Sequence, residues 1–129
     1  MKTFIIYIIF ILLITRIIHI FNKNKITGSK DAADFFQPLL GDLNHEEFWI
    51  IYVNNSNNII SKSQLSKGGI TATLVDVRLI FKNALEIGAT GIVLCHNHPS
   101  GNLKASEADI KITKKIKLAA ESLDITILD

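Results

Sequence analysis

Residues 91–101, GIVLCHNHPSG, decide how the rest of this chain can fold. An apolar run that starts at a glycine and ends at a polar loop is typical of a strand buried on both faces of a sheet. His96 and His98 emerge at the end of this predicted strand. Side chains two residues apart in an extended chain project to the same side, so both imidazoles are expected to reach one point.

A helix is predicted directly downstream, over about residues 107–122. Ser106, followed three residues later by Asp109, fits the capping-box pattern that starts helices. Asp109 also keeps the spacing of the apolar positions, so its carboxylate is expected on the buried face of the helix. The predicted buried stripe comprises Asp109, Ile112, Ile116, Ala119 and Leu123, and the solvated face carries Lys111, Lys114, Lys115 and Lys117.

His96, His98 and Asp109 together predict a metal site. Two neutral imidazoles and one carboxylate leave one position of a tetrahedral zinc shell open, which is the arrangement of catalytic zinc sites. Each half of the pattern also has a simpler explanation, because histidines at strand ends are often merely exposed and Ser106 and Asp109 can serve only as a helix cap. Their combination favours Zn²⁺, and Ser106 can cap the helix and face the metal at once.

A proton acceptor for a metal-activated water is available just before another predicted strand. Glu46 and Glu47 precede residues 48–53, a run of aromatic and β-branched side chains. One of the two glutamates can point into the metal site. Alternation groups Glu46 with Phe48 and Glu47 with Trp49, so periodicity does not choose between them, and either can instead be a solvated carboxylate at the strand end.

The remaining patterns predict an α/β or α+β domain around a mixed, largely antiparallel sheet flanked by helices. We expect a short helix that Ser29 caps and that Pro38 and Gly41 end, and a middle helix that Asp76 caps and Gly88 ends. The expected strands cover residues 48–53, 59–65, 70–75, 91–95 and 123–128, and the expected helices cover residues 29–36, 77–87 and 107–122.

Length and charge limit the function classes. With 129 residues the chain is long enough for one ordinary domain with one core. Lys2 and Arg16 lie in an apolar N-terminal segment, so the remainder balances 12 basic against 12 acidic side chains. This balance argues against strong non-specific binding of nucleic acid. The single cysteine, Cys95, cannot form an internal disulfide and is expected to pack in the core.

The N-terminal segment, residues 1–21, has a separate expected role. Residues 3–21 are almost wholly apolar, and about 20 such residues cross a bilayer, so a single membrane anchor is expected if Arg16 and His19 lie near the interface. More basic residues follow this segment than precede it, which places the domain in the cytoplasm by the positive-inside rule. A signal peptide and a wrongly chosen start codon are the alternatives. Residues 22–28 are then a linker and residues 29–129 the domain.

The chain resembles the JAMM (MPN+) metalloprotease superfamily through its histidine pair, the serine and aspartate downstream and the glutamate upstream. It is similar to the RadC-like branch of the JAB domain in the string HNHPSGN at residues 96–102, with EEFW at residues 46–49. The resemblance covers about residues 29–129 and implies a JAB/MPN-like, cytidine deaminase-like core. It implies zinc held by His96, His98 and Asp109. Ser106 is then the oxyanion-stabilising residue and Glu46 the acid/base.

Departures from the family pattern limit what the resemblance implies. Asn97 stands where ubiquitin-cleaving members have serine or threonine, so their substrate is not carried over. The chain stops at Asp129, where RadC-like proteins continue, so the domain is expected to be C-terminally incomplete. The traditional association of the family with DNA repair makes the lysine face a candidate for nucleic acid. A solvated helix face explains it better, because no base-stacking aromatic residues lie between the lysines.

The sequence therefore predicts a zinc-dependent hydrolase of JAMM type, a metallopeptidase or isopeptidase acting on an unidentified protein or peptide. The alternative from another class is a DNA-repair-associated or protein-binding module whose metal is structural. A third interpretation is an inactive remnant whose missing strands prevent folding.

Overall fold

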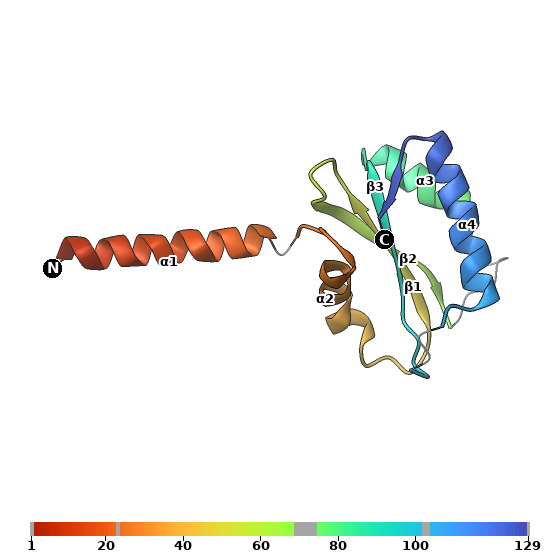
Figure 1. The fold of residues 1–129 in the computed structure, drawn as a ribbon, viewed down its shortest axis with the longest axis horizontal. Coiled ribbons are helices and arrows are strands. Elements are labelled where there is room, and N and C mark those ends of the chain that lie inside the picture. Colours follow the sequence, from red (N-terminus) through yellow and green to blue (C-terminus); the bar gives the residue numbers. More distant parts are fainter. Residues whose placement is uncertain (1, 23, 69–74, 102–103, 129) are drawn as a thin grey trace.

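The computed structural model describes residues 2–22, 24–68, 75–101 and 104–128. The described part of the chain combines helices and strands, as expected for the predicted α/β or α+β class (Figure 1). The elements are α1 (Lys2–Asn22), α2 (Ser29–Leu40), β1 (Glu47–Val53), β2 (Ile59–Lys67), α3 (Val77–Glu86), β3 (Gly91–His96), α4 (Glu107–Ser122) and β4 (Thr126–Leu128).

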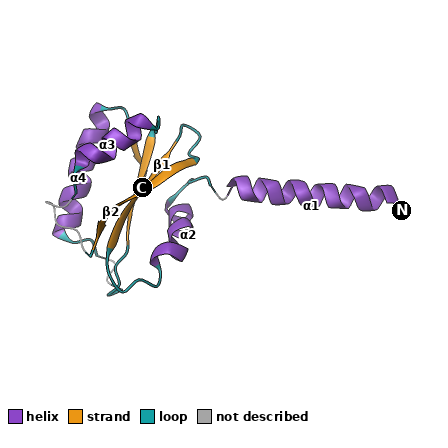
Figure 2. Ribbon diagram, turned by 180° about the vertical axis from the view of Figure 1, so that it is seen from behind, coloured by secondary structure: helices purple, strands orange, loops and turns teal. Residues whose placement is uncertain are grey.

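The four strands form one sheet in the order β2-β1-β3-β4. β1 is antiparallel to both of its neighbours, whereas the three-residue β4 is parallel to β3. Figure 1 shows α3 and α4 on one face of the sheet and α2 on the other, and Figure 2 shows the same layers from behind. This confirms the mixed, largely antiparallel sheet flanked by helices.

β1 contributes to two separate cores because successive residues of a strand face opposite sides of the sheet. Phe48, Ile50 and Tyr52 pack with the buried faces of α3 and α4. Trp49 and Ile51 pack on the other face with the buried side chains of α2. β3 also supplies residues to both cores, which explains why its sequence is apolar on both faces.

The start and end of α2 differ from the prediction. Ser29 is the first residue of the helix rather than its cap, and Gly28 occupies the cap position. The Asp31 carboxylate instead accepts a 2.7 Å hydrogen bond from the backbone N–H of Thr27, which ties the preceding chain to the first turn. Pro38 lies inside α2 rather than ending it, because a proline in the last turn removes only one backbone donor.

The other helices lie close to their predicted positions. The Asp76 side chain caps α3 by accepting from the backbone N–H of Arg78, and Gly88 follows the helix with a φ of +70°. α4 covers the predicted residues. Its fully buried stripe ends at Ala120. Ala119 is half-buried and packs against the core as predicted, whereas the placement of Leu123 on the stripe was wrong, because Leu123 is exposed. The 3.6-residue turn rotates a strict 3,4 pattern gradually off the buried face.

The predicted strand lengths are less accurate than the helices. β2 continues two residues past its predicted end, to Lys67, and β4 is limited to Thr126–Leu128. A further strand was predicted over residues 70–75. Residues 69–74 lie outside the described part of the chain, so only Val75 of that prediction is described.

α1 is a 21-residue helix that lies apart from the sheet (Figure 1). All the large apolar side chains between residues 4 and 18 are exposed. Within the described residues, the structure contains no helix with the length and apolar character that crossing a bilayer requires. The anchor expected over residues 3–21 is not supported by this finding.

Candidate metal centre

Three of the predicted site residues come together at one end of the sheet. His96 is the last residue of β3, His98 lies in the loop that follows, and Asp109 is in the first turn of α4. Each offers one ligand atom, and these atoms all lie within 4.8 Å of one another. Asp109 Oδ2 lies 3.4 Å from Nε2 of His96 and 3.8 Å from Nε2 of His98, and the two Nε2 atoms are also in direct contact.

The helix cap and the metal site use the same aspartate. The backbone N–H of Ser106 donates a 2.8 Å hydrogen bond to Asp109 Oδ2, and the Asp109 N–H donates one of 3.1 Å to the Ser106 hydroxyl. This reciprocal pair is the predicted capping box. Asp109 is 8% exposed, so the cap fixes its carboxylate in a buried position facing the histidines. The capping and ligand interpretations are therefore compatible.

The charge states of the cluster suit a divalent metal. Burial lowers the pKa of His96, and the carboxylates of Asp109 and Glu46 oppose only part of that shift. Burial alone would raise the pKa of Asp109, but hydrogen bonds from Ser106 and the neighbouring histidines hold it below its ordinary value. A neutral imidazole and an ionised carboxylate are the forms that bind metal ions.

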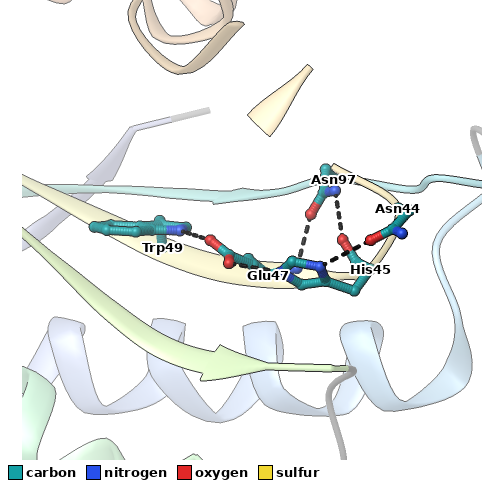
Figure 3. A network of polar contacts seen from close by, with 5 residues as sticks. All are labelled: Asn44, His45, Glu47, Trp49 and Asn97. Carbon is teal, nitrogen blue, oxygen red and sulfur yellow. Dashed lines mark hydrogen bonds and ion pairs between the residues drawn. The ribbon is translucent and has the colours of Figure 1, made fainter. Parts of the chain in front are cut away.

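Glu47 is directed away from this cluster. Its carboxylate accepts hydrogen bonds of 2.8 Å from the Trp49 indole N–H and 2.8 Å from the His45 ring (Figure 3). Donation by Trp49 and His45 lowers the pKa of Glu47 against the effect of burial. Since Trp49 packs on the α2 side of the sheet, Glu47 is held there as a buried anion with both oxygens engaged.

Glu46 directly precedes β1, the strand that pairs with the end of β3 at His96. Phe48 pairs directly with His96 across β1 and β3, and their rings are in contact with centroids 5.9 Å apart. Phe48 and His96 therefore share the face opposite to Glu47, and alternation continued to the residue before β1 predicts Glu46 on that face. Glu46 is exposed, and its charge is near enough to raise the pKa of His96. Its role as a proton acceptor remains a prediction.

The hydroxyl of Ser106 retains capacity for a second interaction. As helix cap it accepts the Asp109 N–H through one lone pair, and its own proton can donate to a second acceptor, the Asp109 carboxylate included. Ser106 is exposed at the start of α4, beside the carboxylate that faces the histidines. Its role in stabilising an oxyanion remains a prediction.

Two other sequence predictions are confirmed by the structure. Cys95 packs against the core on the α2 side, and burial raises the pKa of its thiol to about 11. The lysine face of α4 is solvated as expected; its members, Lys111, Lys114, Lys115 and Lys117, are all exposed.

The metal cluster borders two open clefts. One, of about 530 Å³, lies between the C-terminal half of α2 and the histidine loop and includes the apolar side chains Phe36, Leu40 and Leu43. The other, of about 390 Å³, is lined from α4 and contains His96 and Asp109. His96 thus borders both clefts at the end of β3.

The role of Asn97 and His45 was missed in the sequence. Asn97 was notable only as a departure from the family pattern, and His45 was not singled out. Their contacts join the chain before β1 to the loop after β3, across 52 residues of sequence. No local pattern indicates such a pairing, because it depends on which residues of β1 and β3 lie opposite each other.

Comparisons with known proteins agree with the geometry. The model of the RadC-like JAB domain family matches residues 26–129. A UPF0758 protein of Flavobacterium johnsoniae is 64% identical over 110 residues, which cover 85% of this chain and 48% of that protein. UPF0758 proteins of Porphyromonas gingivalis and Salinibacter ruber are 42% and 36% identical, each over 83% of this chain and 47% and 46% of their own length. The chain thus spans about half the length of these relatives.

Proposed function

Because the chain belongs to the RadC-like JAB domain family, we propose that it is a zinc-dependent hydrolase that cleaves an amide or isopeptide bond in a protein or peptide. The observation that supports this proposal is the convergence of His96, His98 and Asp109. Zinc accepts nitrogen and oxygen ligands, and three protein ligands leave a position for the reacting groups. The donor set therefore fits the ion that the family implies.

Three groups carry out the proposed reaction, and the role of each follows from its charge and position. When bound, zinc would supply the Lewis acidity that makes water a nucleophile near neutral pH and polarises a carbonyl. Glu46, exposed on the His96 face, takes a proton from the attacking water and passes it to the leaving amine. Ser106 donates its hydroxyl proton to the oxyanion that develops on the carbonyl. No covalent intermediate with the protein is required.

The clefts support a peptide rather than a small polar substrate. Phe36, Leu40 and Leu43 give the larger cleft an apolar wall next to the histidine loop. Apolar walls with a few convergent polar groups are typical of ligand sites. An extended peptide can place an apolar side chain there while its carbonyl reaches the metal cluster.

The metal assignment is tested by zinc content. Purified full-length protein should contain about one zinc per chain by plasma mass spectrometry, and His98→Ala should lose it. His45→Ala is the matched control, because this histidine contacts Glu47 and contributes no atom to the cluster. Equal zinc in wild type and His98→Ala would overturn the ligand assignment.

The chemical assignment is tested by cleavage. Zinc-loaded protein is incubated with a proteome-derived peptide library supplemented with ε-lysyl branched peptides, and the products are identified by mass spectrometry. Wild type should generate new termini, and Glu46→Gln should keep zinc but lose roughly a hundredfold or more in rate. If zinc-loaded wild type cleaves neither the library peptides nor the branched peptides, the hydrolase proposal is overturned. That result would favour a binding module with a structural metal.

A further inference from the structure

The side chain of Asn97 binds the backbone on both sides of Glu46. Its Oδ1 accepts a 2.7 Å hydrogen bond from the N–H of Glu47, and its Nδ2 donates a 2.9 Å bond to the carbonyl of His45 (Figure 3). The His45 carbonyl belongs to the peptide group before Glu46, and the Glu47 N–H belongs to the peptide group after it. One planar side chain therefore fixes both peptide groups that flank Glu46.

Two further contacts restrain the same short segment. The Glu46 carbonyl accepts a 2.7 Å hydrogen bond from the N–H of Gly68, just beyond β2. The Glu47 side chain is held on the α2 side by Trp49 and His45. Because the Glu47 side chain is fixed on the α2 side, alternation directs the Glu46 side chain to the opposite face of the sheet, where His96 lies.

We propose that Asn97 is a positioning residue that sets the direction of Glu46 relative to the metal ligands. Asn97 sits between His96 and His98, and alternation turns its side chain away from theirs, toward the segment of residues 45–47. The two hydrogen bonds of Asn97 to the backbone of residues 45 and 47 are called the clamp below. The clamp and the two histidine ligands thus come from three consecutive residues. The same hydrogen bonds tie the histidine loop to the segment that carries Glu46.

The chemistry of the clamp requires an amide. Asparagine offers one acceptor and two donors in one plane, which matches the N–H and the carbonyl that it binds. Aspartate keeps the acceptor for Glu47 but cannot donate to the His45 carbonyl. Alanine loses both bonds. The importance of the clamp for catalysis rests on the proposed function, whereas its existence and its effect on the position of Glu46 do not.

The clamp itself is tested in the full-length, metal-free protein by amide hydrogen exchange. Removing a hydrogen bond of ordinary strength should speed exchange of the Glu47 N–H about fivefold in Asn97→Ala. Asn97→Asp should retain most of the protection, because it keeps the acceptor. Asn55→Ala, in an exposed turn, is the matched control and should leave exchange at Glu47 unchanged.

The unaltered protein provides a test that does not depend on a variant folding. In uniformly labelled wild type, a scalar coupling across the hydrogen bond should connect the Asn97 side-chain nitrogen to the His45 carbonyl carbon. Absence of this coupling together with unprotected exchange at Glu47 would overturn the clamp.

The positioning role is tested with Co²⁺ in place of zinc, using paramagnetic relaxation of the Glu46 carboxyl carbon. This relaxation falls steeply with distance from the ion, so it reports where Glu46 points without any substrate. Asn97→Ala should reduce it several-fold relative to wild type and Asn55→Ala, with bound Co²⁺ unchanged. Equal relaxation in wild type and Asn97→Ala would show that Asn97 does not position Glu46.

The same variants separate this inference from the proposed function. On the most rapidly cleaved peptide of the library, Asn97→Ala should lower kcat with little change in KM, because the clamp acts on a proton acceptor and not on the clefts. If wild type cleaves no peptide but Asn97→Ala still alters exchange and relaxation, the hydrolase proposal fails and the positioning role stands. If Glu46→Gln abolishes cleavage while Asn97→Ala leaves kcat, exchange and relaxation intact, the positioning role fails alone.

Discussion

Asp109 Oδ2 lies 3.4 Å from Nε2 of His96 while accepting a 2.8 Å hydrogen bond from the backbone N–H of Ser106. One carboxylate oxygen thus belongs both to the start of a helix and to the metal cluster. The helix cap supplies the rigidity that a ligand needs, because the carboxylate is ordered by the backbone whether or not a metal is bound.

The double role of Asp109 predicts that two substitutions separate its functions. Asp109→Asn keeps a side-chain acceptor for the Ser106 N–H but removes the charge, so zinc should be lost while the melting temperature of the metal-free protein changes little. Asp109→Ala should lose zinc and also about 1 kcal/mol of stability, because the capping box is broken. Zinc content and thermal melts in the presence of a chelator measure both effects. Full zinc occupancy in either variant would contradict the assignment.

Ser106 provides a similar separation between stability and catalysis. Ser106→Ala should cost about 0.5–2 kcal/mol of stability, whereas Ser106→Gly should cost only a few tenths, because glycine is tolerated at the cap position. Both variants lack the hydroxyl, so both should lower kcat by about the same factor, on the order of a hundredfold. Chemical denaturation and peptide cleavage are the measurements. If kcat follows stability across the pair instead, Ser106 acts only as a cap.

Glu47 makes stability depend on pH. Hydrogen bonds from Trp49 and His45 hold its pKa below the ordinary value of 4.5 in the folded protein. A pKa that is lower folded than unfolded means that the ionised carboxylate stabilises the fold above about pH 4.5 and that this contribution is lost as the pH falls below it. Glu47→Gln should therefore be less stable than wild type near neutral pH, with the difference shrinking in acid. Urea denaturation at several pH values tests this, and a difference independent of pH would argue against it.

Cys95 should be poorly reactive in the folded protein. Burial raises the pKa of its thiol from 9.0 to about 11, which reduces the thiolate near neutral pH by roughly a hundredfold. Alkylation by iodoacetamide should be slower by at least that factor in native protein than in urea, as followed by mass spectrometry. Similar native and denatured rates would show that the thiol is accessible and ionised.

Much of the site could be predicted because its signals are local. The histidine pair follows an apolar strand, and Asp109 follows the helical period of α4, so each ligand's direction depends only on residues near it in sequence. The helix limits were also accurate where a side chain caps the end, as Asp76 does for α3. α2 was less accurate, because the hydrogen bond between Thr27 and Asp31 replaces the expected cap.

The sequence by itself determined the order of the described elements of the domain, the mixed sheet and the three candidate ligands, because hydrophobic period and spacing are properties of neighbouring residues. Only the tertiary structure placed the Glu47 carboxylate with His45 and Trp49, away from the metal cluster. Alternation alone leaves open which side of the sheet each residue of β1 faces. The pairing of Phe48 with His96 and the hydrogen bonds of Asn97 to residues 45 and 47 fix that side. Those contacts join segments distant in sequence, and so no pattern within either segment contains them.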